Sequence, residues 1–198
     1  MKKIVLVSYF LLLGIVSAMS QVSIYTTKIG DFRGPIKSVI SSSDHSFTVD
    51  SFNLDGMIQK SINSAQKHYI VFEWTDKVIK QKFYDRASNK FLSESQLSYS
   101  KDENSFVVST SNGSYSWDFT TSTFTSKDHM DRVLFSMQTT DKTSEGYIST
   151  LYIQNQPTST TKVKTYDADE YGNYTRLVTI TNDGVEHERN VGYEYYEK

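Results

Sequence analysis

Hydrophobic and polar residues alternate along much of this 198-residue chain, which is the pattern of extended strands. The stretch from Tyr69 to Thr75 shows it most clearly, because Ile70, Phe72 and Trp74 fall on one face of a strand. A second stretch repeats the pattern, with Tyr115, Trp117 and Phe119 on one face. Each stretch is therefore predicted to be a β-strand that packs on one side.

Turn signals separate the predicted strands at short intervals. Asp55-Gly56 and Asn112-Gly113 are residue pairs that tolerate the positive φ of a tight hairpin turn, and Glu145-Gly146 marks a third hairpin. No amphipathic run of helix length lies between the turns. Strands joined by short connections pair as neighbours. The sequence therefore predicts an all-β fold, an antiparallel meander of successive hairpins that forms one large twisted sheet or an open sandwich, with little helix.

Two segments have a second interpretation. Met57 to Ala65 fits a strand or a short helix, because its apolar positions match both periods. Asn89 to Tyr99 fits a strand or one helical turn. An open sheet would leave two edge strands unpaired, so a homodimer formed through the sheet edges is the oligomer that this fold predicts.

The first twenty residues have the pattern of an export signal. Lys2 and Lys3 precede the apolar run from Ile4 to Val16, and Ala18 and Ser20 place small residues at a cleavage site. The apolar run is shorter than a membrane span requires. We therefore predict a signal peptide at residues 1–20, a single β-hairpin-repeat domain at 21–198 without a transmembrane segment, and an exported product that is periplasmic or secreted.

The composition argues against several classes of function. The net charge of −2 is close to neutral, whereas nucleic acid binding requires a clustered basic surface, so no nucleic-acid partner is expected. The chain has no cysteine, which excludes disulfides, thiolate metal sites, a cysteine nucleophile and a lipid attached to cysteine.

One turn pattern recurs in the chain. Tyr166-Asp167 leads through Asp169 to Gly172-Asn173, and Tyr84-Asp85 leads in the same way to Ser88-Asn89. This pattern resembles the YD-repeat (RHS-like) hairpins, and more closely the small exported bacterial proteins of unknown function with degenerate YD-like hairpins. Their Gly-Pro-x-Lys-Ser-Val-like opening is matched by Gly34 to Val39. The resemblance implies a hairpin fold and does not imply the toxin-shell activity of true RHS proteins, because the units here are few and irregularly spaced.

The sequence contains no recognisable catalytic or metal-binding motif. Its histidines show no zinc-ligand spacing; they are His45, His68, His129 and His187. There is no Gly-x-Ser-x-Gly elbow, phosphate-binding loop or dinucleotide fingerprint. We therefore expect no catalytic residues, no bound metal and no cofactor, and we do not expect an enzyme. A pair of carboxylates that meet only in three dimensions is the catalytic site that a sequence would not reveal.

The aromatic stripes are the candidate binding surfaces. Stripes of this kind stack on sugars or apolar ligands in exported β proteins, so five side chains are candidates for ligand stacking: Phe72, Trp74, Tyr115, Trp117 and Phe119. The alternative, which we favour, is that these side chains form the core, because large aromatic residues are usually buried on one face of a sheet.

These observations lead to three functional hypotheses. The preferred one is a non-catalytic binding or interaction module at the cell envelope, whose partner is an unidentified protein or glycan. The second is a carrier of an apolar ligand inside a curved, aromatic-lined sheet. The third is a glycan hydrolase that uses an unidentified carboxylate pair.

Overall fold

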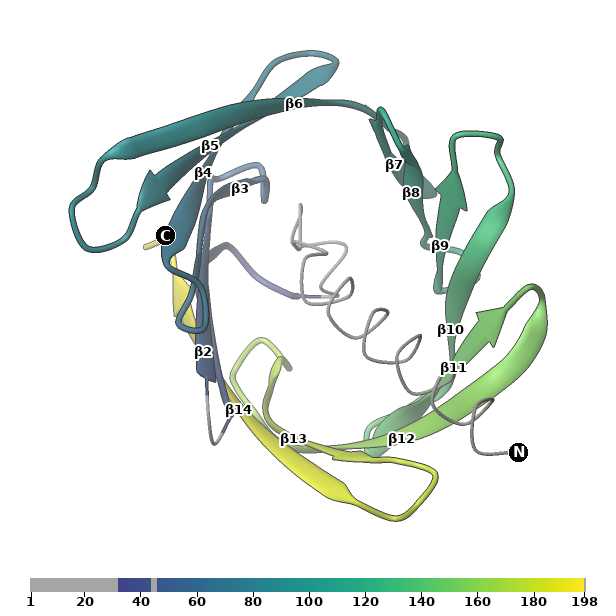
Figure 1. Cartoon of the computed structure of the whole chain (residues 1–198). Helices are drawn as coiled ribbons and strands as arrows, with labels where there is room; N and C mark the ends of the chain where they lie inside the picture. The colour runs from purple at the N-terminus through teal and green to yellow at the C-terminus, as the bar shows by residue number, and fades with distance from the viewer. Residues whose placement is uncertain (1–31, 44–45, 198) are drawn as a thin grey trace.

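The computed structural model describes residues 32–43 and 46–197. Its fourteen strands follow one another as an antiparallel meander and close into one barrel, which Figure 1 shows along its axis. The strands are β1 (Ile36–Ser43), β2 (Ser46–Phe52), β3 (Ile58–Asn63), β4 (His68–Trp74), β5 (Val78–Asp85), β6 (Phe91–Lys101), β7 (Ser105–Thr110), β8 (Gly113–Asp118), β9 (Thr123–Asp128), β10 (Val133–Thr143), β11 (Gly146–Ile153), β12 (Gln156–Ala168), β13 (Tyr174–Ile180) and β14 (Glu186–Tyr195).

The structure confirms the predicted all-β antiparallel meander. The prediction of an open sheet or an open sandwich is wrong. β1 pairs with β14 in an antiparallel ladder that runs from Ile36 opposite Tyr195 to Ser42 opposite Asn190. The sheet is therefore neither an open sheet nor a sandwich. The reason is that every strand pair adds twist and coiling in the same sense, so the first and last strands meet. Within the described residues the closed sheet has no free edge strand, which removes the basis for a dimer paired through sheet edges.

Both segments with a second interpretation are strands. Met57 precedes β3, which continues to Asn63, and β6 contains most of the segment from Asn89 to Tyr99. The hydrogen-bonded partners on both sides decide these cases, because β3 pairs with β2 and β4 and β6 pairs with β5 and β7. Tertiary pairing of this kind overrides an ambiguous local period.

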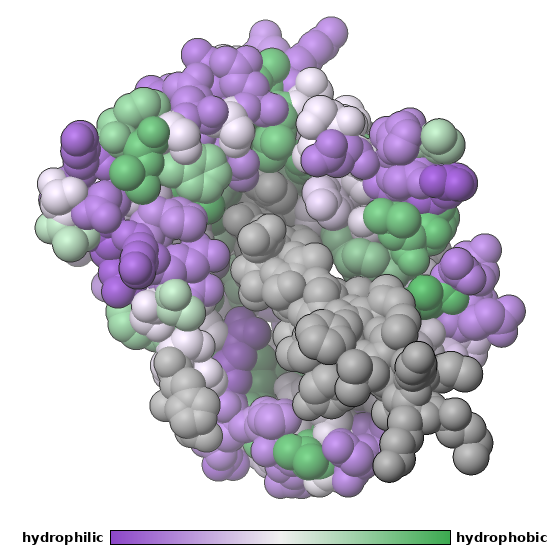
Figure 2. All heavy atoms as spheres, in the orientation of Figure 1, coloured by the Kyte–Doolittle hydropathy of each residue, from purple (hydrophilic) through white to green (hydrophobic). Residues whose placement is uncertain are grey.

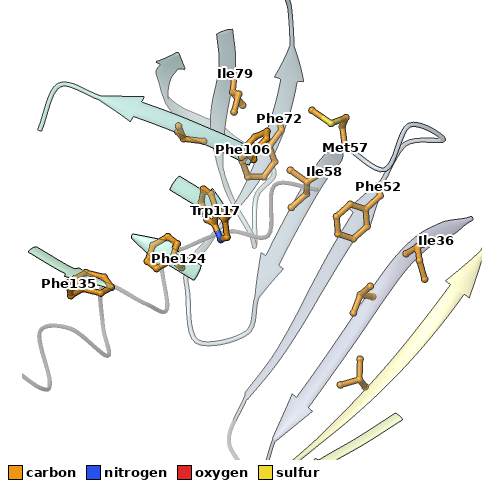
Figure 3. Packing of buried hydrophobic residues seen from close by; sticks show 13 residues of the cluster. Ile36, Phe52, Met57, Ile58, Phe72, Ile79, Phe106, Trp117, Phe124 and Phe135 are labelled. Carbon is orange, nitrogen blue, oxygen red and sulfur yellow. The ribbon is translucent and has the colours of Figure 1, made fainter. Parts of the chain in front are cut away.

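The hydrophobic core lines the inner face of the barrel and is concentrated toward one end. This end, which we call the aromatic end, carries the turns after β2, β4 and β8. Phe52 and Phe106 are almost fully buried there, and their rings belong to one continuous cluster. Figure 3 shows how the cluster extends across the neighbouring strands; its labelled members are Ile36, Phe52, Met57, Ile58, Phe72, Ile79, Phe106, Trp117, Phe124 and Phe135.

Figure 2, which views the barrel along its axis, shows hydrophilic side chains over much of the rim with separate hydrophobic patches between them. One apolar row crosses the outer wall from β1 to β6, because each member is the cross-strand partner of the next: Ile40, Val49, Ile62, Tyr69, Tyr84 and Phe91. Tyr69 stacks on Tyr84 with ring centroids 5.3 Å apart, and the ammonium of Lys60 lies 4.5 Å from the Tyr69 ring centroid. Such cross-strand pairs stabilise the sheet from outside.

A buried hydrogen-bond network holds the seam where the barrel closes. Asn173, in the turn between β12 and β13, is only 4% exposed. Its side chain accepts the Arg33 N–H at 2.7 Å, and it donates to the Arg33 carbonyl and the Tyr195 hydroxyl, both at 2.8 Å. Asp169 shapes the turn by accepting the N–H groups of Tyr171 and Asn173 at 2.9 and 2.8 Å. The turn therefore fastens the residues before β1 to the end of β14.

Two of the three segments that carry the YD-like resemblance meet at this seam, whereas the segment from Tyr84 to Asn89 lies at the end of β5 and in the turn before β6. Gly34 has a φ of 81°, and a Cβ at that position would lie 2.6 Å from the ring of Tyr171. Only glycine allows this backbone conformation and this close approach together. The Tyr171 ring also packs on Tyr195, with centroids 4.3 Å apart. The Gly-Pro opening therefore packs directly against the Asp169–Asn173 turn, through Gly34 and Tyr171.

The signal peptide expected at residues 1–20 lies outside the described residues, as does His45. In the part of the chain that the structure does describe, no helix is long and apolar enough to cross a membrane.

Candidate functional site

The inner face of the barrel changes from apolar to polar along its length. On β1 and β14 the apolar residues Val39 and Val191 lie toward the aromatic end, while Ser41 and Arg189 follow on the same face toward the opposite, polar end. Arg189 is exposed although it shares a face with buried Val191, so solvent reaches this part of the inner wall. The boundary between the two halves is the candidate site.

Asp50 is the acidic group at this boundary. It lies on β2, on the same face as Phe52, and is 8% exposed. Burial raises the pKa of its carboxyl from 3.8 to about 6, and this effect outweighs a hydrogen bond from Ser61 and the charge of Arg189, which both favour the ionised form. Asp50 therefore changes its charge under mildly acidic conditions.

Arg189 is the cationic group. Its Nε donates a hydrogen bond to the hydroxyl of Ser41 on the neighbouring strand β1. Its charge acts on Asp50, one strand further along the wall. Burial raises the pKa of Tyr193, which lies four residues beyond Arg189 toward the aromatic end, to about 12. The Tyr193 hydroxyl is therefore neutral and donates to the Tyr174 carbonyl at 3.0 Å.

The pKa of Asp50 predicts how stability depends on pH. The folded protein holds the Asp50 proton more tightly than the unfolded chain does, so the free energy of unfolding falls as pH rises from about 4 to about 6. The expected loss is about 3 kcal/mol for a shift of this size. Urea unfolding of wild type and Asp50→Asn from pH 4 to pH 8 measures it. The variant should lack this loss and exceed wild type in stability at pH 7.

Asp118→Asn is the matched control for this experiment. Hydrogen bonds from Thr120 and Thr121 hold the pKa of Asp118 below its usual range, so its carboxyl titrates below the pH window of Asp50. Asp118→Asn should therefore keep the wild-type slope between pH 4 and 6. Equal slopes for Asp50→Asn and wild type would contradict the assignment.

All five candidate ligand-stacking residues belong to the inner face. Phe72 and Trp117 are buried members of the core cluster, while Trp74, Tyr115 and Phe119 are partly buried and pack against it. The Trp74 indole N–H donates to the Ile58 carbonyl at 2.6 Å. The structure thus brings both aromatic stripes together in the core at one end of the barrel. Their stacking on a ligand stays a prediction.

A groove of about 590 Å³ lies on the outer wall over β1, β13 and β14. It is lined by Ser42, Ser43, Val178, Glu186, Glu188 and Asn190. The two glutamates alternate with inward-facing His187 on β14, and both are exposed.

The described histidines do not converge. His68 is on β4 with its ring against Phe83, His129 follows β9, and His187 is on β14. Over residues 32–43 and 46–197, no three His, Asp or Glu side chains are grouped so that they could hold a metal ion.

The boundary pair was missed by the sequence reasoning, although each residue gives a local signal. Asp50 lies on the face of β2 that carries apolar side chains, two residues before Phe52. Arg189 lies on the corresponding face of β14, two residues before Val191. A charge in the inward register of a strand is expensive unless it has a partner. That the charge of Arg189 acts on Asp50 follows only from barrel closure.

Comparisons with protein-family models, with curated proteins and with solved structures gave no match. The YD-like resemblance therefore stays a prediction. The structure defines the class of protein as a closed, fourteen-stranded antiparallel barrel.

Proposed function

We propose that the chain is an exported, non-catalytic binding protein that holds an apolar or amphipathic molecule inside its barrel. The observation that supports this most directly is the closure of fourteen strands around an inner face that is aromatic at one end and polar at the other. A barrel of about eight strands is filled by its own side chains or holds one small ligand, and one of about 16 to 18 strands leaves a channel. The strand number here lies much nearer to the second case.

The aromatic end supplies the apolar part of such a site. Trp74, Tyr99 and Phe106 pack edge to face and offset, with the Trp74 and Tyr99 centroids 5.1 Å apart. The cluster continues through Trp117 to Phe124, whose ring centroids are 5.0 Å apart. Aromatic walls with a few polar groups are typical of sites that bind small molecules.

A binding role is also favoured over hydrolysis by the distribution of acids. Burial raises the pKa of Asp50 above its usual value, and the groups that act on its carboxyl are Ser61 and Arg189 rather than a second acid. Glu186 and Glu188 form a pair on the outer wall, but they are exposed. A pair of carboxylates with divided acid and base roles is what a glycosidase needs.

The two tryptophans provide the test, because Trp74 and Trp117 are the only ones in the chain and both lie at the aromatic end. Trp74→Phe and Trp117→Phe each leave one reporter. Dibrominated stearate, whose bromines quench tryptophan at short range, should lower the emission of wild type and of both variants saturably and at one equivalent. Unbrominated stearate is the matched control and should bind without quenching.

Two results would contradict the proposal. Quenching that rises linearly without saturation would mean collision from solvent rather than a bound chain. Unchanged emission in wild type, with calorimetry that shows no heat of binding, would mean that the barrel does not hold an alkyl chain.

A further inference from the structure

We infer that Arg189 is the anchor for an anionic head group, so that the ligand class is an alkyl carboxylate whose chain extends toward the aromatic end. This inference rests on the proposed binding function and specifies its ligand. It is carried by the position of one cation at the boundary between the two halves of the inner face.

The position of Arg189 fits a head group and a chain at the same time. Along β14, Val191 and Tyr193 follow it on the inner face, and both pack with the core cluster. In the other direction the inner face carries His187, which is exposed. A molecule with its head at Arg189 would therefore place its chain against apolar side chains and leave the polar end of the barrel to water.

The chemistry of the guanidinium selects a carboxylate. Arginine has five N–H donors in a fixed planar fork that matches a carboxylate, and it keeps its charge at all relevant pH values. The hydrogen bond to Ser41 uses the donor on Nε and fixes the orientation of the side chain. Because Arg189 is exposed, an entering anion can reach it without first displacing packed side chains.

Asp50 adds a second prediction, because its carboxylate competes with an incoming anion for the charge of Arg189. Its carboxyl lies on the same inner wall and feels the charge of Arg189. A second carboxylate at Arg189 would repel Asp50 when both are ionised. Removing the Asp50 charge should therefore strengthen the binding of an anionic ligand, whereas removing the Arg189 charge should weaken it.

The test is calorimetric titration of the folded protein at pH 7 with three probes that share a twelve-carbon chain: dodecanoate, dodecanol and dodecyltrimethylammonium. Wild type should bind dodecanoate most tightly and the ammonium most weakly. Arg189→Gln should weaken dodecanoate binding about 10- to 100-fold, the usual effect of losing a hydrogen bond to a charged group. Its dodecanol affinity should not change.

Two further variants complete the design. Asp50→Asn should tighten dodecanoate binding and leave dodecanol binding unchanged. Arg176→Gln is the matched control, because Arg176 stacks on Tyr166 on the opposite face of the neighbouring strand β13, with its guanidinium 4.4 Å from the ring centroid. It should bind all three probes as wild type does.

The binding results distinguish failure of this inference from failure of the proposed function. Equal affinities of wild type for dodecanoate and dodecanol would overturn the head-group assignment while leaving a binding barrel, and this result needs no variant to fold. Wild-type dodecanoate affinity in Arg189→Gln would overturn it as well. If none of the three probes binds wild type, the proposed function fails and the inference fails with it.

Discussion

Asn173→Ala is expected to destabilise the protein by about 3 to 5 kcal/mol, one of the two largest effects that we predict. The substitution removes one acceptor and an NH2 group that donates two hydrogen bonds, from a residue that is 4% exposed. It leaves the Arg33 N–H and carbonyl without this partner, while the Tyr195 hydroxyl keeps its hydrogen bond to Asp169. Each buried polar group left unsatisfied costs about 1 to 3 kcal/mol. Urea unfolding followed by tyrosine and tryptophan emission measures the change.

Asn182→Ala is the control for this substitution. Asn182 also lies in a turn, between β13 and β14, but it is exposed and its side chain accepts the Thr160 N–H at 3.3 Å. Because Asn182 is exposed, water can replace its side chain as the acceptor for the Thr160 N–H. The free energy of unfolding is therefore expected to change by less than about 1 kcal/mol. Similar small losses for both asparagines would show that the seam does not depend on the Asn173 network.

Phe106→Ala is expected to have the second large effect, a loss of about 3 to 5 kcal/mol. The Phe106 side chain is 1% exposed, and its ring packs against those of Trp74, Tyr99 and Trp117 with centroids 6.4, 5.8 and 5.8 Å away. Truncation leaves a cavity in the middle of the aromatic end that the surrounding strands cannot close. Equilibrium unfolding measures the loss, and the emission of the tryptophans should shift to the red as water enters.

Phe91→Ala is the matched control, since it makes the same chemical change on the outer face. Phe91 is 50% exposed, and its ring contacts Tyr84 edge to face at 5.7 Å. Removing it costs part of one cross-strand pair, about 0.2 to 1 kcal/mol. If the two phenylalanine variants were equally stable, the aromatic end would not be the core of the barrel.

Both experiments bear on the binding proposal as well as on stability. The aromatic end must be a continuous wall for an alkyl chain to lie against it, and Asn173 holds the seam between β1 and β14 on which Arg189 is placed. We therefore expect Phe106→Ala to weaken the binding of dodecanol and dodecanoate alike, in contrast to Arg189→Gln, which should affect only the charged probe.

The strands and their order could be predicted because their causes are local. The alternation in β4 places Phe72 on the apolar face of that strand. The hairpin between β7 and β8 also forms where the sequence predicts it, although its two turn residues are Ser111 and Asn112, and Gly113 is already the first residue of β8. The same alternation indicates that the aromatic stripes form the core, and the structure buries Phe72 and Trp117. The apolar residues of the segments at β3 and β6 fit both a helix and a strand. Only pairing with the neighbouring strands decides that these segments are strands.

The candidate site could not be predicted because its members are brought together by closure. Ser41 and Arg189 are 148 positions apart and belong to the first and last strands, which are neighbours only in a closed sheet. The same holds for Asn173 and Arg33, which are 140 positions apart. An open sheet with the same strands would separate each pair by the full width of the sheet.

The sequence by itself determined that this protein is an antiparallel β meander, where most of its strands lie and which of their faces is apolar. These properties depend on the period of two and on turn chemistry, which act over a few residues. Only the tertiary structure decided that the sheet closes into a barrel and that Asp50 and Arg189 share its inner wall. The reason is that closure is the sum of small twists and bends over fourteen strand pairs, and no single residue encodes that sum.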